Sequence, residues 1–531
     1  MKTARAAWLV AGLLVAGIAL RIALQFPLHR YAPEADCTTI AFGAWEILSG
    51  DLRIFVSTGY RQGALPSYLM AAASLLVGPG RAALALAVLA VGLLQMFVWW
   101  AALLELTGWR ASDTASARLL AFVILPSPAM LTWGIYWPNG YPDLILAGTL
   151  VLWTGARFWR RGGLRELFFC AFACGFAFWM SMVNLSLIFP VLAWLVWQRC
   201  RALLAWRALT AATIGALLGA SPWLVFNLRY GWVSLKSNWA VRPVSDETAL
   251  FRNIRRFFGE VLPTLFESGT QEGTFASNPV GRLSGWVALA LATVAVVVLV
   301  GALRRRLGER APAGESVAEL PALFGLATGV AMTTALLFIF SGAAAVPGNI
   351  VRYILPLFLV WPLLAALAWE FASPIARRGI ALLALFLLAG YAAAVPWPWT
   401  SERKALREAL AVEHQMIERL EANGVDTIFG SFWESYPLIF ESGGRLAGST
   451  LEPDCDFHHF EERLPEGPCR WALVARPRIA AKLREASGLR GPLVRFADGR
   501  WLFLPEPPAD SVSSAPTCTE VLARLRAAAH S

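Results

Sequence analysis

The chain has 531 residues, of which 57% are hydrophobic and 15% are charged, and its net charge is +10. This apolar share exceeds what the surface of a soluble globular protein accommodates, so the composition predicts a multi-span membrane protein. The arginines gather in short clusters between apolar runs, where the positive-inside rule expects them, so the positive charge does not indicate nucleic-acid binding.

The first apolar run, residues 6–25, is long enough to cross a bilayer. Lys2 and Arg5 precede it and favour a cytoplasmic N-terminus. The run continues through Arg21 without a convincing cleavage site, so we expect a retained signal anchor rather than a cleaved signal peptide. The polar segment that follows then emerges on the opposite side of the membrane.

Ten further apolar runs predict eleven transmembrane spans in all. Residues 64–78 are not among them, because about 14 apolar positions are typical of a helix that lies along the membrane. If this run does not cross, every strong arginine cluster between closely spaced spans lies in the cytoplasm, and the C-terminus lies outside. The expected spans are 6–25, 84–105, 116–134, 142–158, 166–182, 184–198, 208–226, 284–302, 318–341, 352–371 and 379–396.

This arrangement of spans predicts a transmembrane domain over residues 1–400, with a first outer loop at 26–83 and a second large outer loop at 227–283. Residues 401–531 are much less hydrophobic and predict a separate extracytoplasmic domain. Its patterns predict helices at 402–421 and 478–486 and strands at 426–430, 471–475, 493–497 and 501–504. The expected fold class is a polytopic α-helical membrane protein with a small C-terminal soluble α/β domain.

The cysteines and the absence of two common catalytic motifs limit the classes of function that the chain can have. Cys455 and Cys469 would form a disulfide if the tail lies outside the cytoplasm. The nearby His458 and His459 lack the paired spacing of a zinc site, which favours the disulfide. The absence of a Walker loop and of a G-x-S-x-G elbow argues against ATP-driven transport and serine hydrolysis.

Two carboxylates, Glu34 and Asp36, follow the first span in a segment with little apolar bulk. A carboxylate here can act as a general base toward an acceptor hydroxyl, or the pair can hold a divalent cation, Mg²⁺ or Mn²⁺. In the alternative, Asp36 caps a helix that begins near Thr38. The motif alone favours neither interpretation.

The surroundings of Asp36 are more specific. Arg21, Asp36 and the segments 41–51 and 59–71 together resemble the first outer loop of the GT-C superfamily, in its protein O-mannosyltransferase-like and aminoarabinose-transferase-like branch (glycosyltransferase family 39-like). The resemblance implies polyprenyl-phosphate sugar donors, loop helices along the membrane, and Asp36 as the catalytic base. Where that branch usually has Asp-Glu, this chain has Asp36-Cys37, with Glu34 as the nearest other acid. Further segments that resemble the family are 221–223, 227–231, 351–356 and, in the tail, 432–442.

A donor phosphate needs cationic groups, and arginine binds phosphate oxygens in a bidentate fork. The candidates are Arg352, Arg255, Arg256 and Arg229. Their alternatives are binding to anionic headgroups for the loop arginines and snorkelling to the interface for Arg352.

The candidate residues of a substrate cleft are Tyr60, Arg61, Tyr141, Asn139 and Tyr353. The sequence favours the alternatives, which are an aromatic belt for Tyr60 and an interfacial turn for Asn139 and Tyr141. Asp143 follows the outer segment that contains Asn139 and Tyr141, and it either orients a substrate hydroxyl or caps the next span.

These observations predict a membrane glycosyltransferase that moves a sugar from a polyprenyl-phosphate donor to the hydroxyl of a lipid, glycan or protein acceptor outside the cytoplasm. The resemblance implies an inverting reaction and a bacterial inner membrane. One rival is a non-catalytic transporter or flippase for a lipid-linked glycan, although the expected spans carry few acids near their centres. Another rival is a surface-glycan polymerase or ligase, which the basic loop 227–283 leaves open.

Overall fold

The computed structural model describes residues 2–31, 33, 35–56, 62–111, 113–131, 133, 141–236, 247–266, 279–308, 315–341, 350–393, 401–451, 464, 469–475, 492–497, 500–504 and 516–530. The chain separates into two compact units, and each is described by itself. The helical unit comprises Met1–Gln25, Arg61–Gly63 and Val88–Pro396. The mixed unit comprises Phe26–Tyr60, Ala64–Ala87 and Trp397–Ser531, and it therefore groups most of the first loop with the tail.

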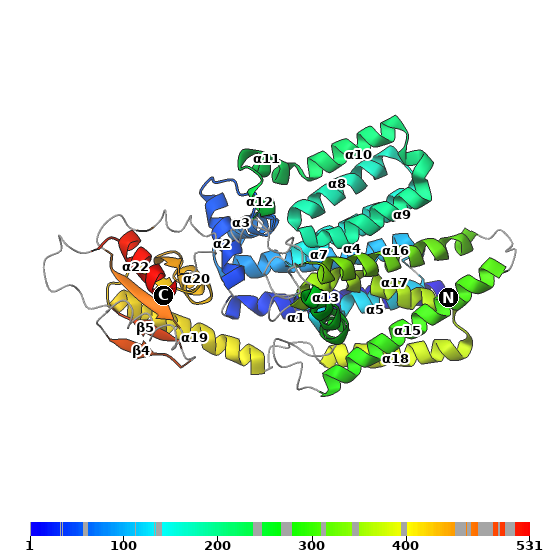
Figure 1. Cartoon of the computed structure of the whole chain (residues 1–531). Coiled ribbons are helices and arrows are strands. Elements are labelled where there is room, and N and C mark those ends of the chain that lie inside the picture. The colour runs from blue at the N-terminus through cyan, green and yellow to red at the C-terminus, as the bar shows by residue number, and fades with distance from the viewer. Residues whose placement is uncertain are drawn as a thin grey trace. The chain divides into compact units, whose positions relative to one another are not determined.

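Long apolar helices make up most of the helical unit (Figure 1). Helix α4 begins in the mixed unit and continues into the helical one. The helices are α1 (Lys2–Gln25), α4 (Arg81–Thr107), α5 (Thr114–Ile124), α6 (Pro128–Leu131), α7 (Tyr141–Arg161), α8 (Leu164–Met180), η3 (Met182–Asn184), α9 (Leu185–Leu203), α10 (Trp206–Gly219), α11 (Ser221–Arg229), α12 (Val233–Lys236), α13 (Glu247–Arg256), η5 (Phe257–Val261), α14 (Leu262–Phe266), α15 (Pro279–Gly308), α16 (Glu315–Ile339), η8 (Ile350–Ile354), α17 (Leu355–Phe371) and α18 (Pro374–Ala393).

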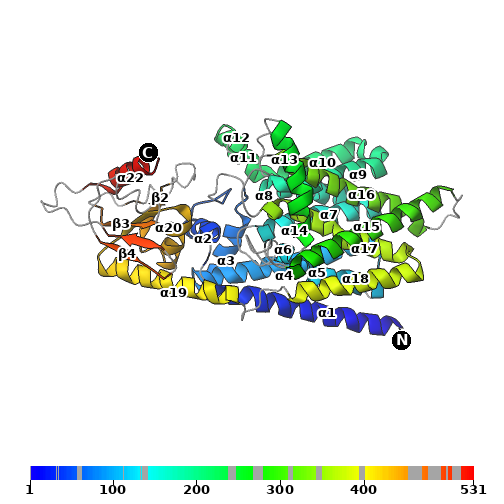
Figure 2. The ribbon, with the colours of Figure 1, turned by 60° about the horizontal axis from the view of Figure 1, so that its bottom comes forward.

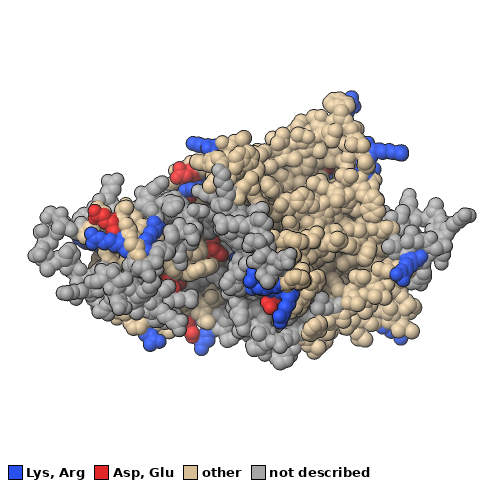
Figure 3. Space-filling view, viewed as in Figure 1, with Lys and Arg blue, Asp and Glu red and all other residues tan. Residues whose placement is uncertain are grey.

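The described part of the chain contains six helices that are long and apolar enough to cross a membrane. The pair α10 and α11, bent by 64°, makes a seventh if it counts as one span. On the face shown in Figure 3, uncharged residues cover most of the described surface of the helical unit. The chain is a multi-pass membrane protein. Each predicted run coincides with a helix or a pair of helices, but the total of eleven spans stays a prediction.

Helix α3 (Leu65–Val77) covers the run that we expected to lie along the membrane. Its 13 residues extend about 20 Å, whereas the hydrocarbon core of a bilayer is about 30 Å thick. Pro66 in its first turn and Gly78 at its end delimit the helix. Its length therefore agrees with a helix that does not span.

Helices α8 and α10 lie side by side in close contact (Figures 1 and 2). A Cβ atom on Gly175 would lie 2.3 Å from the carbonyl oxygen of Ala216, and one on Gly219 would lie 2.1 Å from that of Phe172. Only glycine allows two helix backbones to approach this closely. The seam holds α10 against α8 just before the chain bends into α11, which carries Arg229.

The mixed unit contains a five-stranded sheet in the order β2-β1-β3-β5-β4. Strands β2, β1 and β3 are parallel, and β5 is antiparallel to both of its neighbours. Thr427 lies opposite Ala447 on one side and Trp471 on the other. The strands are β1 (Thr427–Gly430), β2 (Ala447–Thr450), β3 (Trp471–Ala475), β4 (Leu493–Arg495) and β5 (Trp501–Phe503). The sheet confirms the small α/β domain predicted for the tail.

The two faces of the sheet belong to different hydrophobic cores, because successive side chains along a strand point to opposite faces. Phe429 belongs to the core that contains α22 (Cys518–His530). Ile428 belongs to the core that contains α19 (Ser401–Ala422) and α20 (Phe432–Glu441). That second core also contains α2 (Ala35–Leu48) and α3 of the first loop. The first loop and the tail therefore share one hydrophobic core.

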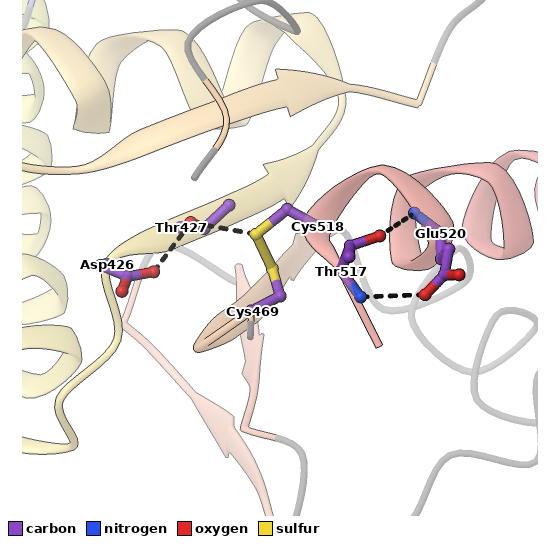
Figure 4. The surroundings of a disulfide bond; sticks show 6 residues. All are labelled: Asp426, Thr427, Cys469, Thr517, Cys518 and Glu520. Atoms are coloured by element: carbon purple, nitrogen blue, oxygen red, sulfur yellow. Dashed lines mark hydrogen bonds between the residues drawn. A yellow bond between two sulfur atoms is a disulfide. The ribbon is translucent and has the colours of Figure 1, made fainter. Parts of the chain in front are cut away.

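A disulfide joins Cys469, just before β3, to Cys518 at the start of α22 (Figure 4). The predicted pairing of Cys469 with Cys455 is therefore wrong, and Cys455 lies outside the described residues. Thr517 and Glu520 form a capping box beside the bond, since each backbone N–H donates to the other's side chain, at 3.0 Å and 3.3 Å. The cap and the disulfide together set where α22 begins.

Candidate functional site

Arg352 is the centre of a cluster of aromatic side chains in the helical unit. It lies in the 3-10 helix η8, which leads directly into α17. Its guanidinium carbon lies 5.6 Å from the ring centre of Trp133, 5.4 Å from that of Tyr141 and 5.2 Å from that of Tyr353. Its Nη2 also donates a hydrogen bond of 3.2 Å to the hydroxyl of Tyr353. We call Trp133, Tyr141, Arg352 and Tyr353 the arginine cluster.

The arginine cluster is assembled from three separate parts of the chain. Tyr141 is the first residue of α7, and its ring meets that of Trp133 edge-on at 5.9 Å. Ring faces attract a cation through their quadrupole and use few of its N–H donors. The cluster therefore orients a half-buried guanidinium, which is the kind of group that binds the oxygens of an anion such as a phosphate.

Arg21 in the first span orders the approach to Trp133. It is 1% exposed, and it donates hydrogen bonds to the carbonyl oxygens of Ile124, at 2.8 Å, and of Val123, at 3.0 Å. These carbonyls belong to the last turn of α5, where the chain leaves the helix toward α6 and Trp133. A cation at a helix C-terminus is favoured by the helix dipole. Arg21 thus has a structural partner in the described part of the chain.

The predicted arginines of the second large loop lie in two other places. Arg255 is exposed on α13, and Arg256 pairs with Glu260 at 3.5 Å across the π-helix η5. A buried hydrogen bond of 2.9 Å from Asn253 to the carbonyl oxygen of Ile339 holds α13 to the end of α16. Short π-helical segments often occur at functional sites, and this one contacts η8, the element of Arg352.

Arg229 belongs to a different aromatic group. Its guanidinium lies 5.6 Å from the ring centre of Tyr230, which is in contact with Phe226 at 4.7 Å. The neighbouring Trp232 has a positive φ of 63°, a backbone conformation that is unusual for a residue with a side chain. The structure therefore does not place Arg229 among the aromatic residues around Arg352.

Asp143 lies in the first turn of α7 and is 5% exposed. Its Oδ1 atom has no hydrogen-bond partner among the residues that the structure describes. Tyr141, two residues earlier, belongs to the arginine cluster. The buried carboxylate of Asp143 thus lies two residues from the arginine cluster in sequence.

Asp36 lies in the mixed unit, in the first turn of α2, and is half-buried. The helix begins at Ala35, so the alternative in which Asp36 caps a helix from Thr38 is wrong. Thr39 donates a hydrogen bond of 2.7 Å to the backbone carbonyl of Asp36, and Thr38 does the same to Ala35. A carboxylate in a first helical turn interacts favourably with the helix dipole.

Several predicted site residues lie outside the described residues: Glu34, Tyr60, Arg61 and Asn139. The structure brings together Arg352, Tyr353 and Tyr141 of the predicted set. The sequence analysis missed Trp133, because it fell inside the apolar run 116–134. The available signal was its place eight residues before Tyr141, on the other side of the segment Trp137-Pro-Asn-Gly.

No protein-family model and no curated protein sequence matches the chain. Solved structures do match. ArnT from Cupriavidus metallidurans bound to undecaprenyl phosphate superposes with a TM-score of 0.60 at 16% identity, over 94% of this chain and 99% of that chain. The same protein in the apo state gives a TM-score of 0.60 at 15% identity, over 95% and 99%.

A third match, the Archaeoglobus fulgidus oligosaccharyltransferase complex with Zn and sulfate, has a TM-score of 0.43 at 13% identity. It covers 93% of this chain and 73% of that chain, and its similarity is too low to support an argument. The ArnT structures, by contrast, match nearly the whole length of both chains. They confirm the predicted resemblance at the level of the fold: this chain shares the fold of these ArnT structures.

Proposed function

We propose that this protein transfers a sugar from a polyprenyl-phosphate donor to an acceptor hydroxyl outside the cytoplasm. The observation that carries the proposal is the arginine cluster, in a chain whose fold matches an ArnT structure bound to undecaprenyl phosphate. The donor class comes to this chain from that neighbour and from the sequence resemblance. The acceptor is a lipid, a glycan or a protein.

Arg352 is the proposed ligand of the donor phosphate. When the bond between the anomeric carbon and the phosphate oxygen breaks, the oxygen keeps the electron pair and negative charge develops on it. A guanidinium already oriented by three rings stabilises that charge without having to reorganise during the reaction. Arginine also keeps its charge at every physiological pH.

Asp36 is the proposed base. Its carboxylate takes the proton of the acceptor hydroxyl while that oxygen forms the new bond to the anomeric carbon, and it later releases the proton to solvent. Attack on the face opposite the leaving phosphate inverts the configuration, as the sequence resemblance implies. If the enzyme uses Mg²⁺ or Mn²⁺, Glu34 and Asp36 are its expected ligands.

Two observations support a bacterial inner-membrane location with the tail outside the cytoplasm. The disulfide between Cys469 and Cys518 is typical of an oxidising compartment. The arginine clusters between spans lie on the cytoplasmic side if α3 does not cross, and α3 has only 13 residues. Both agree with a cytoplasmic N-terminus.

The test is a transfer assay with purified protein in nanodiscs and a panel of undecaprenyl-phosphate sugars, which measures the release of undecaprenyl phosphate. We expect release by the wild type from at least one donor and a loss of about 10²–10⁴-fold in Asp36→Asn. Donor binding without release from any donor by the wild type would favour the transporter instead. Normal release by a folded Asp36→Asn variant would remove Asp36 from its proposed role.

A further inference from the structure

We propose that helix α20 of the C-terminal domain positions α2, the helix that carries Asp36, and that Phe440 and Glu441 are positioning residues for this base. The inference rests on the proposed function, since it assigns the tail a role in that reaction. It makes the C-terminal domain part of the catalytic apparatus rather than a separate appendage. All of its contacts lie within the mixed unit.

Aromatic contacts connect the two helices. Trp45 of α2 stacks on Phe440 of α20, with ring centres 5.7 Å apart and ring planes 21° from parallel. Phe42 of α2 meets Tyr436 of α20 edge-on at 5.6 Å, and both side chains are almost completely buried. These two pairs, about one helical turn apart on each helix, restrict both the position and the rotation of α2.

A buried carboxylate lies next to the stacked pair. Glu441 is 3% exposed at its side chain, and it pairs with Arg81 at 3.2 Å and with His414 at 3.3 Å. Arg81 begins α4, and His414 belongs to α19. Glu441 thus joins the last turn of α20 to a second tail helix and to the end of the first loop.

The ion pairs of Glu441 are better suited to fixing the arrangement of the helices than to stabilising the fold. Burial raises the pKa of Glu441, and the attraction of Arg81 and His414 only partly opposes this effect. The charged form therefore costs free energy in the folded protein compared with water. Buried ion pairs of this kind are weak stabilisers, and their best-attested use is to specify one arrangement of the elements they join.

The position of α2 matters because Asp36 is rigidly connected to these contacts. Asp36 lies six residues before Phe42 in one uninterrupted helix of 14 residues. The intervening Cys37, Ile40 and Ala41 are buried in the same core. A rotation or shift of α2 therefore moves the carboxylate, and a misplacement of about 1 Å is enough to cost about 10² in rate.

The test compares Phe440→Leu and Glu441→Gln in the full-length protein, since both keep most of the side-chain volume. Arg445→Gln is the matched control, because it breaks an exposed ion pair of the same domain, with Glu421 at 2.9 Å. The first readout is amide hydrogen exchange of residues 35–48, which requires no activity. The second is undecaprenyl-phosphate release, resolved into kcat and KM for the donor, beside wild type and Asp36→Asn.

We expect faster exchange in α2 and a kcat lower by about tenfold to a hundredfold in both variants, with the donor KM within about twofold of wild type. Arg445→Gln should match wild type in both readouts. Unchanged α2 exchange, or a full kcat in both variants while Asp36→Asn is inactive, would overturn the positioning role and leave the proposed function intact. If wild type releases nothing from any donor, the proposed function fails, and the exchange readout still decides whether α20 holds α2.

Discussion

The arginine cluster of the helical unit and the α2–α20 contact of the mixed unit orient a functional side chain by different means. Around Arg352, three ring faces hold the guanidinium itself. For Asp36, the packing acts on the helix, through aromatic pairs six and nine residues further along α2. The group proposed to bind an anion is thus held directly, and the group proposed to move a proton is held through its backbone.

The largest expected effect is on the stability of the mixed unit, which contains the disulfide, when that bond is removed. Cys518→Ser should lower the free energy of unfolding of the mixed unit by about 2–5 kcal/mol, because the disulfide connects residues 49 apart in sequence. Thermal unfolding followed by proteolysis of the tail would measure this change. Cys200→Ser is the control, since Cys200 is an exposed free thiol. Equal stability of the wild type with and without reductant would contradict the expectation.

The second effect concerns the phosphate contact. Arg352→Lys keeps the charge but loses the bidentate fork, so the affinity for undecaprenyl phosphate should fall by about 1.5–3 kcal/mol. Binding can be followed by titration in nanodiscs. Arg255→Gln on α13 is the variant for comparison. An equal loss of affinity for undecaprenyl phosphate in this variant would mean that the phosphate site includes α13. Unchanged affinity in Arg352→Lys would remove Arg352 from the site.

A third effect tests the rings around Arg352. Trp133→Leu should weaken undecaprenyl-phosphate binding by about 0.5–2 kcal/mol, since one ring face that orients the guanidinium is lost. Trp369→Leu is a matched control, because its ring lies 4.4 Å from the guanidinium of Arg118 elsewhere in the helical unit. Equal weakening in the two variants would mean that the effect is a general loss of stability.

The smallest effect is a pH dependence in the mixed unit. Because burial raises the pKa of Glu441 above the usual 4.5, the folded state holds this proton more tightly than the unfolded state. Its contribution to stability is complete below pH 4.5 and is lost as the pH rises through the raised pKa. The unfolding temperature of wild type relative to Glu441→Gln should therefore fall from pH 4 to neutral pH. A difference that grows with pH would mean that Arg81 and His414 dominate instead.

Local patterns predicted much of this fold. Hydropathy predicted where the apolar helices lie, and the length of α3 agrees with the prediction that it does not span. Strands β1, β3, β4 and β5 and helix α19 lie where their residue patterns predicted them. The small residues of β2, Ala447–Thr450, carry no alternating pattern, so that strand was missed. Helix α22 was also missed, and the helix predicted at 478–486 lies outside the described residues.

The sites depended on contacts that no local pattern encodes. Trp133 and Arg352 are more than two hundred residues apart, and so are Phe42 of α2 and Tyr436 of α20. Cysteine spacing favoured Cys455 as the partner of Cys469, but the fold brings Cys518 to it instead. The family resemblance selected Asp36, and the need of a donor phosphate for a cation selected Arg352, yet only the packing showed what holds each of them.

The most direct test of the account is the release of undecaprenyl phosphate by wild type, Asp36→Asn and Arg352→Lys in one nanodisc assay with undecaprenyl-phosphate sugars. The account predicts release by wild type, almost none by Asp36→Asn with donor affinity retained, and weakened donor affinity in Arg352→Lys. Full release by a folded Asp36→Asn protein would contradict the proposed base. Intact donor binding without any release by wild type would contradict the transferase itself.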